Sequence, residues 1–342
     1  MQFIITNEKG EEVTLLTDKQ YIDIEIGEGR NNFSIQIDKN YQKKWGINTG
    51  WWIGCPGTEY GGIIDGIQSV NETIVFTGMT WRGLLMKKII EPPTGQDYLV
   101  VSGDAHNIIN DVSCSQFDGI FVCSGSSGIT FNNFQFDRYV SHLDGFEKML
   151  LSKNAKIEFA YNSGESNGKA FVSIKAVPII DYSDEIEYSK DGALYYIYFS
   201  FKRFTGGINH LICLGKGELK DRLVIHLYVQ QDGTIGNEKY YTGKDEKVAI
   251  YDYSNAESAD DLREKGMERL KELMSYVDMD MNLYNSSLER LAKSDIKVGD
   301  IVGGRDFDTG IYLRKQISKK IIEIKNGKET IEYKVGGSAS SV

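Results

Sequence analysis

The first part of the chain alternates apolar and polar residues at the period of a β-strand. Residues 21–26 and 33–37 alternate most regularly, so each is predicted to bury one face. Short apolar runs between turn-forming residues predict further strands at 3–5, 13–16, 51–53, 62–67 and 73–76. A short helix is predicted from 81 to 90, because Pro92 and Pro93 disfavour helical geometry just before them.

The pattern changes near residue 98. Residues 105–112 and 146–151 have helical character, and 125–128 is a Gly/Ser loop. The runs 156–161 and 170–174 predict a hairpin. We therefore expect a separate α+β insertion at 98–185, peripheral to the flanking strands.

Strands are predicted again at 194–201, 208–214, 223–229, 300–302, 310–313, 320–324 and 330–333. Between them, a helix is expected over 254–274. Ser254 and Glu257 have capping-box spacing, and Leu262, Leu270, Leu273 and Met274 share one helical face. A second helix is expected at 286–292, and the last residues, 337–342, are expected to be flexible.

Two stretches of the chain repeat the same spacing of residues. Residues 47–54 align with 296–303, and each stretch is followed by a Gly-Ile pair, at Gly62 and at Gly310. Each then reaches a hairpin, at 71–74 and 328–331, and the second hairpin is longer. The alternative is that β-proteins share such turn-strand patterns by chance. If the repeat is real, the chain holds two related small barrels.

These patterns predict a mainly β (α+β) fold with two small related antiparallel β-barrel tube domains. The first barrel is expected at 1–97, the inserted α+β domain at 98–185, and the second barrel at 186–253 together with 296–336. A helical insertion is expected at 254–295. Three copies of such a chain would place six similar barrels around one axis, so a trimer could mate with a sixfold ring.

Composition narrows the classes of function. The formal net charge is 39 − 49 = −10, which disfavours a protein that grips DNA but not a surface past which DNA slides. The four cysteines form no C-x-x-C pair and are expected to be reduced, mostly buried thiols of a protein made in a cytosol. No signal peptide and no membrane-spanning run is predicted.

Two motifs resemble functional sites but fit turns or linkers better. Residues 164–168 match G-x-S-x-G around Ser166, but both flanks are predicted strands, so a hairpin turn is favoured over a nucleophile elbow. Residues 278–282, with Glu289, nearly fit a calcium loop. The sixth position holds Leu283 where the loop needs glycine, so we interpret the segment as a helix linker.

No catalytic, cofactor-binding or metal-binding residue is predicted, no cofactor is expected, and the chain is expected not to be an enzyme. None of His106, His142, His210 and His226 has metal-type spacing, and His210 and His226 are expected to be packed or surface residues. The acids Asp260 and Asp261 suit the first turn of a helix. The tryptophans Trp45, Trp51, Trp52 and Trp81 could form a sugar-binding platform, but a role in cores or subunit interfaces is favoured.

An ordered set of short motifs carries a family resemblance. It begins with residues 62–67, Thr77-Gly78, Trp81-Arg82-Gly83 and Ile89-Ile90. It continues with residues 215–218, Asp221-Arg222, residues 262–266 and residues 299–302. Together these resemble phage tail hub proteins, the tail-tip hubs of siphophages and the baseplate hubs of contractile tails. The resemblance runs from about residue 1 to 336 and is weakest over 98–185.

The resemblance implies a homotrimeric ring without an active site of its own, located in the tail of a virion or phage-like particle and synthesised in the bacterial cytoplasm. One face would stack on the tail tube ring and the other would bear a spike, fibre or tail lysin. A tape-measure protein is a further candidate partner, and DNA would pass through the channel without specific binding. No membrane partner is expected.

Two other functions and one detail of the ring stay open at this stage. A tail-associated hydrolase would need a convergent catalytic set, and a carbohydrate-binding host-attachment module would bind glycans without trimerising. Asp23 and Glu25 share one strand face. The ordinary interpretation of these acids is a solvated face. Our hypothesis is that barrel-strand acids such as Glu25 and Glu332 help to make the lumen of the trimer acidic or neutral.

Overall fold

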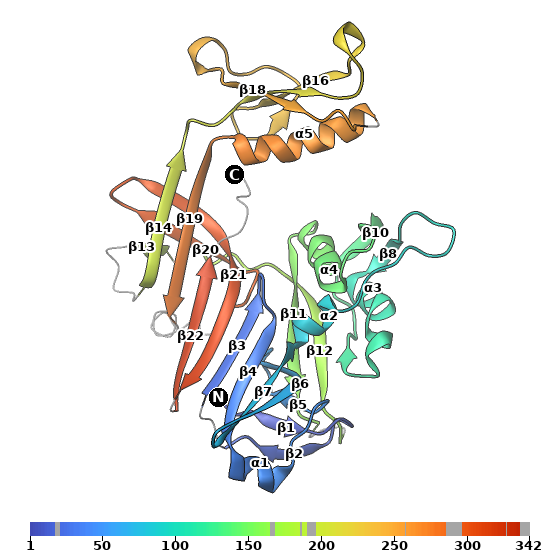
Figure 1. The fold of residues 1–342 in the computed structure, drawn as a ribbon, viewed down its shortest axis with the longest axis vertical. Helices are drawn as coiled ribbons and strands as arrows, with labels where there is room; N and C mark the ends of the chain where they lie inside the picture. Colours follow the sequence, from blue (N-terminus) through green and yellow to red (C-terminus); the bar gives the residue numbers. More distant parts are fainter. Residues whose placement is uncertain are drawn as a thin grey trace.

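The computed structural model describes residues 1–17, 21–164, 168–184, 187–189, 196–256, 258–284, 296–325 and 327–335. The protein is mainly β, with several antiparallel sheets and a few short helices (Figure 1). The largest sheet has 13 strands, and its main path runs in the order β14-β19-β22-β21-β3-β4-β7-β6-β5-β1-β2. The described strands do not close into a barrel, so the two-barrel prediction stays a prediction.

The N-terminal residues supply the lower part of this sheet. Its elements are β1 (Ile4–Thr6), β2 (Glu12–Leu15), β3 (Tyr21–Gly27), β4 (Asn32–Asp38), α1 (Lys39–Trp45), β5 (Trp52–Gly54), β6 (Gly61–Val70), β7 (Thr73–Thr80) and α2 (Trp81–Met86). All seven predicted strands are confirmed. Helix α2 ends four residues before the predicted boundary, and α1, which Asp38 caps, has no counterpart in the sequence prediction.

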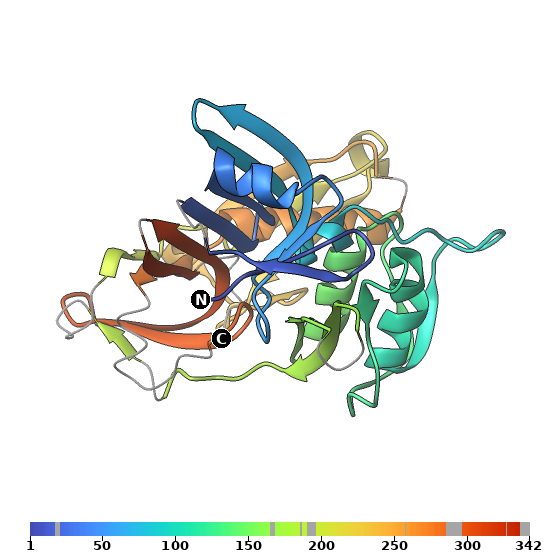
Figure 2. The same cartoon turned by 90° about the horizontal axis from the view of Figure 1, so that it is seen from below.

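The middle residues form a lobe beside the sheet, built around two helices and a hairpin (Figures 1 and 2). Its elements are β8 (Val100–Asp104), α3 (Ala105–Val112), η1 (Cys114–Phe117), β9 (Phe121–Val122), β10 (Thr130–Gln135), α4 (His142–Leu151), β11 (Ala155–Asn162) and β12 (Phe171–Pro178). The predicted helix at 105–112 is confirmed, as is the hairpin, because β11 and β12 pair antiparallel.

The next strands form a small upper unit. Its elements are β15 (His210–Leu214), η2 (Leu219–Asp221), β16 (Val224–Val229), β17 (Ile235–Gly236), η3 (Gly243–Asp245), β18 (Val248–Asp252) and α5 (Ala259–Leu273). The four strands pair with one another in the order β17-β16-β15-β18, and α5 packs on this sheet through Leu262 and Leu270. The second-barrel prediction requires the strands at 210–252 to join those at 301–335 in one sheet. In the structure they form separate sheets.

The second half of the large sheet comes from two separate stretches of the chain. Its strands are β13 (Glu187–Ser189), β14 (Tyr196–Phe204), β19 (Tyr276–Tyr284), β20 (Ile301–Asp306), β21 (Ile311–Lys325) and β22 (Lys328–Val335). Strand β21 is long enough to pair with β20 through its first residues and with β22 and β3 through the rest. The pairing of β21 with β3 joins the two halves into one sheet.

Two predictions within the helical insertion are wrong. Residues 278–282, interpreted as a helix linker, form part of strand β19. The cap of the long helix is Ser258, whose hydroxyl accepts a hydrogen bond from the backbone N–H of Asp261, so the helix begins later than the predicted Ser254 box. The predicted helix at 286–292 and the tail at 337–342 lie outside the described residues.

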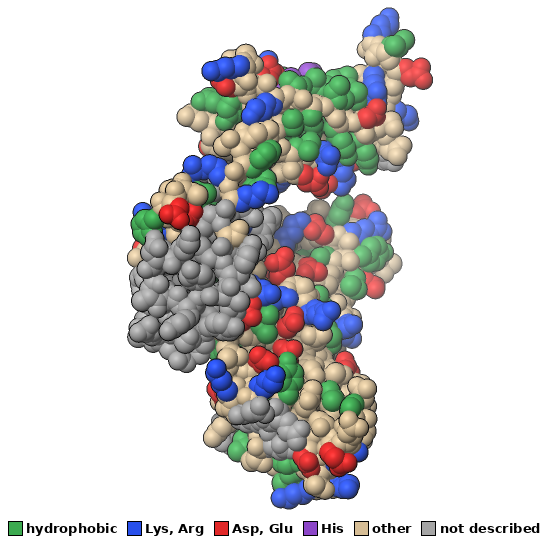
Figure 3. All heavy atoms as spheres, turned by 60° about the vertical axis from the view of Figure 1, so that its left-hand side comes forward, with side chains coloured by type: hydrophobic (Ala, Val, Ile, Leu, Met, Phe, Trp, Pro, Cys, Tyr) green, Lys and Arg blue, Asp and Glu red, His purple; other side chains and the backbone are tan. Residues whose placement is uncertain are grey.

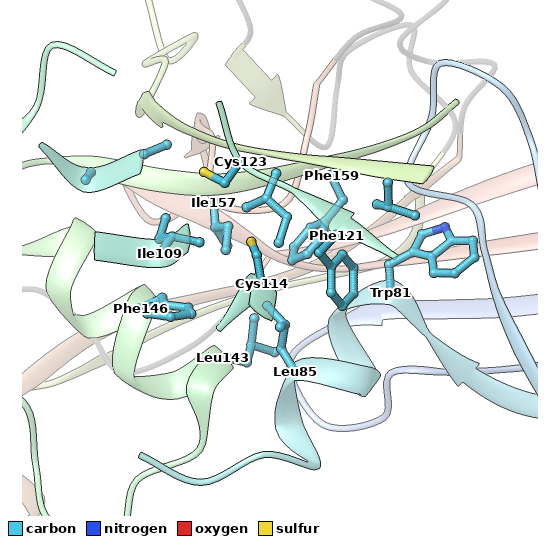
Figure 4. Close-up of a cluster of buried hydrophobic side chains, with 14 of the residues drawn as sticks. Trp81, Leu85, Ile109, Cys114, Phe121, Cys123, Leu143, Phe146, Ile157 and Phe159 are labelled. Carbon is cyan, nitrogen blue, oxygen red and sulfur yellow. The ribbon is translucent and has the colours of Figure 1, made fainter. Parts of the chain in front are cut away.

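The described residues form three hydrophobic cores. The first spans both halves of the large sheet, since Ile22 and Ile24 of β3 pack with Ile322 and Ile324 of β21. The second fills the middle lobe and includes Trp52, Trp81 and Leu85 from the N-terminal part (Figure 4). The third lies between α5 and the upper sheet. Because the first core is shared, the two halves of the large sheet bury apolar surface together.

Candidate assembly surface

The two halves of the large sheet repeat one order of strand pairing. In the first half the order is β3-β4-β7-β6-β5, and in the second half it is β14-β19-β22-β21-β20. Every neighbouring pair is antiparallel in both halves. Shared turn patterns alone would not produce five strands in the same spatial order, so the repeated order supports the internal repeat predicted from the sequence.

A turn and a bulge occupy one place in the first half. Gly50, at φ 81°, donates its backbone N–H to the carbonyl of Ile64, and the N–H of Ile64 donates to the carbonyl of Trp51, at 2.8 and 2.9 Å. The register of β6 against β7 shifts between Ile64 and Gly66. Such a bulge places one extra residue in a strand and bends it.

The second half repeats this device. Gly299, at φ 93°, donates to the carbonyl of Ile317, and Ile317 donates to the carbonyl of Asp300, both at 2.8 Å. The register of β21 against β22 shifts between Ile317 and Lys319. Ile64 and Ile317 are therefore equivalent positions, and this equivalence fixes the alignment of the two halves residue by residue.

This alignment corrects one part of the predicted repeat. Gly62 pairs with Ile53 and its equivalent Lys315 pairs with Val302, so Gly62 does not correspond to Gly310. Gly310 lies in the turn between β20 and β21. The longer second hairpin is confirmed. Beyond the bulge, β6 pairs over residues 66–70, whereas β21 pairs over residues 319–325.

The face of the sheet opposite the first core carries charges of both signs. The register places these charged residues of β3, β21 and β22 on one face: Asp23, Glu25, Glu323, Glu332, Lys319, Lys325, Lys328 and Lys334. Four acids and four lysines make this set formally neutral. Lys319 pairs with Glu25 at 3.1 Å and Lys334 with Glu332 at 3.9 Å.

Like charges meet where the two halves join. Asp23 of β3 lies directly opposite Glu323 of β21, and Glu25 is two residues along the same strand face. Half-burial, followed by the charges of Glu25 and Glu323, raises the pKa of Asp23. Burial, with Asp23 and Glu323 nearby, also raises the pKa of Tyr21.

A buried arginine ties the middle lobe to the first half of the sheet. Arg82 of α2 is 2% exposed. Its Nε donates to Glu59 at 2.8 Å, one terminal nitrogen donates to Glu147 of α4 at 3.1 Å, and the other donates to the carbonyl of Ile157 in β11 at 3.0 Å. These partners come from three different segments, so Arg82 fixes their relative positions.

A second buried cluster ties the lobe to the other half. Lys156 of β11 lies 2.7 Å from Asp300 and 3.1 Å from Glu158, and Lys297 lies 2.8 Å from the other oxygen of Glu158. Asp300 also accepts hydrogen bonds from the backbone N–H groups of Lys297 and Ile180. Although burial acts to raise it, the pKa of Glu158 is lowered by the two lysines.

The tryptophans are core and near-core residues. Trp81 is fully buried, stacks on Tyr161 with ring centroids 5.8 Å apart, and meets Trp52 edge-on at 6.1 Å. Trp45 and Trp51 are partly buried against the first core. This agrees with the favoured interpretation of packing residues rather than a sugar platform.

The four cysteines are all buried free thiols, as the sequence predicts. Burial raises the pKa of Cys114 to about 11, of Cys123 to about 12 and of Cys213 to about 11. Cys114 and Cys123 lie among the aromatic side chains of the middle lobe (Figure 4). At neutral pH such thiols stay protonated and unreactive.

Two histidines of the upper unit form a chain of hydrogen bonds that the sequence did not indicate. His210 Nδ1 lies 2.7 Å from Glu246 Oε1, and His210 Nε2 lies 2.8 Å from His226 Nδ1. Glu246 also pairs with Lys239 at 2.7 Å, and the hydrogen bonds from Lys239 and His210 lower the pKa of Glu246. Both histidines are on the sheet face that α5 does not cover, because His226 lies opposite Ile212, two residues after His210.

The other motifs do not assemble into a site in the part of the chain that is described. Residues 165–167, including Ser166 of the G-x-S-x-G match, lie outside it, as does Glu289. No group of three or more His, Cys, Asp or Glu among the described residues is arranged to hold a metal ion. None of the described helices is long and apolar enough to cross a membrane. Figure 3 shows basic and acidic side chains interspersed, and hydrophobic ones gathered on the upper unit.

Comparison with solved structures gives two informative matches. The 43 kDa tail protein of prophage MuSo2 from Shewanella oneidensis has a TM-score of 0.58 and 11% identity, and the match covers 100% of both chains. The tail protein from Neisseria meningitidis MC58 has a TM-score of 0.50 and 10% identity, over 98% of this chain and 96% of that one. No protein-family model and no curated protein sequence matches the chain. The predicted resemblance to phage tail proteins is thus confirmed at the level of the fold, which this chain shares from end to end.

Proposed function

We propose that this chain is a structural hub protein of a phage or phage-like tail, made in the bacterial cytoplasm and incorporated into the particle. Three copies form a ring that joins the tail tube to the spike, fibre or lysin at the tip. The observation that carries the proposal is the repeated half-sheet within a fold shared with phage tail proteins. Two equivalent halves in each of three chains present six similar surfaces, which a sixfold tube ring can contact.

Each part of the chain has its own role in the proposed ring. Residues 1–97, and the sheet formed by β14 and β19–β22, supply the two tube units. The domain at 98–185 lies outside the ring, held by the clusters around Arg82 and Lys156. The upper unit, with the helix of the 254–295 insertion, is a separate attachment for a tip partner.

The charged face of the large sheet suits the wall of a channel. DNA slides past a surface that offers no net positive charge, because a basic lining would hold its phosphates. The charged set of β3, β21 and β22 is formally neutral, and its lysines are balanced by acids on the same strands. The lumen in this proposal is acidic or neutral, with Glu25 and Glu332 among its acids, and it carries DNA without specific binding.

The test is the mass and shape of the purified protein. Light scattering at increasing concentration is expected to give the mass of three 38.5 kDa chains, and electron microscopy is expected to show rings with a central hole. Addition of the tail tube protein should produce stacked rings, whereas a tape-measure protein should bind inside the channel. A monomer at every concentration, with and without the tube protein, would contradict the proposal.

A further inference from the structure

Strands β6 and β14 of the large sheet each have an edge without a partner among the described residues. Beyond its bulge, β6 pairs with β7 along one side over residues 66–70, while β5 pairs only with residues 61–63 on the other side. Strand β14 pairs with β19 on one side alone. Each edge presents a row of backbone N–H and C=O groups that can accept another strand.

The second half of the sheet shows how such an edge is filled. Beyond the equivalent bulge, β21 pairs with β22 on one side and with β3 on the other, over residues 319–325. In the alignment of the halves, β21 corresponds to β6 and β3 corresponds to β14. The contact within the chain therefore joins a second-half β21 to a first-half β3. Its counterpart joins a first-half β6 to a second-half β14, and only another copy can supply that β14.

The pairing tables fix the register of this contact. Gly66 corresponds to Lys319, because each is the first paired residue after the bulge, so Gln68 corresponds to Ile321. The pairings of β7 and β4 lead from Ile64 to β3, and those of β22 and β19 lead from Ile317 to β14. They make Ser200 of β14 equivalent to Glu25 of β3. Within the chain, Ile321 lies opposite Glu25.

We propose that the free edge of β6 binds strand β14 of a second copy of this chain, antiparallel, with Gln68 opposite Ser200. Neighbouring residues follow in the same register, so Gly66 lies opposite Lys202. The inference rests on the proposed ring and specifies the contact that closes it. With three chains, three seams lie within chains and three between them, and all six have the same strand pairing.

Exposure along the free edge agrees with this partner. Ile67 points to the side of the sheet that carries the first core, because it pairs with buried Phe76, yet it is 40% exposed. Its equivalent, Lys320, lies opposite Ile26 of β3 and is 5% exposed. The edge of β6 thus presents apolar surface at a position that the neighbouring strand covers in the other half.

The register can be tested by disulfide trapping. The chain carrying both Gln68→Cys and Ser200→Cys is oxidised with copper phenanthroline and run on a non-reducing gel. Covalent dimers and trimers are expected, and a mixture of the two single variants should give dimers. The four native cysteines are buried, so they leave the background low.

Two matched controls calibrate the test. The pair Glu25→Cys and Ile321→Cys occupies the equivalent positions within one chain, so it should oxidise without any gain in mass. The pair Gln68→Cys and Arg203→Cys is out of register and places the two thiols on opposite faces, so it should give no covalent oligomer.

The outcomes separate this inference from the proposed function. Covalent oligomers from the Gln68/Ser200 pair, and none from the Gln68/Arg203 pair, support both the contact and the proposed function. A ring of three chains whose Glu25/Ile321 pair oxidises but whose Gln68/Ser200 pair does not would overturn this contact and leave the hub function standing. A protein that stays monomeric and gives no covalent oligomer would overturn the ring, and this contact with it.

Discussion

The two halves of the large sheet share the same glycine turn and β-bulge but have different residues beside them. In the first half, Gly50 is followed by Trp51, which packs partly buried against the first core. In the second half, Gly299 is followed by Asp300, which is 1% exposed. Its carboxylate forms an ion pair with Lys156 and accepts hydrogen bonds from two backbone N–H groups. The turn and the bulge therefore define the shared fold, while the side chain after the glycine is free to acquire a separate role.

The difference shows how one repeated unit holds the middle lobe at two places. The first half contacts the lobe through Trp81 and Arg82, which follow β7. The second half contacts it through Asp300, at the start of β20. Asp300 corresponds to Trp51, which cannot form such an ion pair, so this contact with the lobe distinguishes the two copies of the repeat.

The largest expected effect follows from removing Asp300. Asp300→Ala leaves the ammonium of Lys156 buried with Glu158 as its remaining ionic partner, so we expect a loss of about 3 kcal/mol in the free energy of unfolding. Urea denaturation measures it. Asp97→Ala, at an exposed site, is the control and should change stability by less than about 0.5 kcal/mol.

A double variant tests the cause. Lys156→Met with Asp300→Leu removes both charges together, so it should recover most of the lost stability. If the double variant is no more stable than Asp300→Ala, the loss comes from the two backbone hydrogen bonds of Asp300 rather than from the stranded charge.

An intermediate effect tests the equivalence of the two turns. Gly50→Ala and Gly299→Ala each force a side chain into the left-handed region, which costs about 1–2 kcal/mol. The two losses should be similar, with Gly299→Ala somewhat larger because its Cβ would lie 3.2 Å from Lys156 Cδ. Thermal unfolding of both variants gives the comparison. A severalfold difference between them would show that the turns are not equivalent.

The smallest effect concerns the seam between the halves. The pKa of Asp23 is raised in the folded protein, so the folded state binds this proton more tightly than the unfolded state does. Stability therefore falls as pH rises from about 4 through the folded pKa, and the loss persists above it. Asp23→Asn should be more stable at pH 7, by less than about 1 kcal/mol because the group is half exposed.

The pH profile supplies the check on that variant. The advantage of Asp23→Asn should shrink as the pH falls below about 4, where Asp23 is protonated in both states. An advantage that is independent of pH would assign the effect to packing or hydrogen bonding instead.

Regular alternation made most of the large sheet predictable. Each strand with one buried face shows it in the sequence, as in β3 and β4. Strand β19 alternates as well, through Val277, Met279, Met281 and Leu283, but its intervening acids suggested a calcium loop and a linker. Helix α1 was missed because it buries no residue and so shows no apolar period, leaving only Asp38 as a cap signal.

The joining residues were harder to predict, for a physical reason. Lys156 and Asp300 are far apart in the chain and neither differs locally from a surface charge, so only the fold reveals that they are buried together. The long helix had two candidate caps, since Ser258 and Asp261 repeat the spacing of Ser254 and Glu257. The repeat itself was visible partly because Gly50 and Gly299 occupy equivalent left-handed positions, which few other residues tolerate.

Strands β14 and β19 are the two chain segments that carry the upper unit away from the large sheet, as Figure 1 shows. They run antiparallel for nine residues each, and β19 continues its pairing into β22. A pull on the upper unit along these strands loads the hydrogen bonds between β19 and β22 in shear, all together, whereas a sideways pull would break them one by one. The pair therefore acts as a stiff strut along its length, so a push or pull at the tip is transmitted to the sheet instead of being absorbed at the connection.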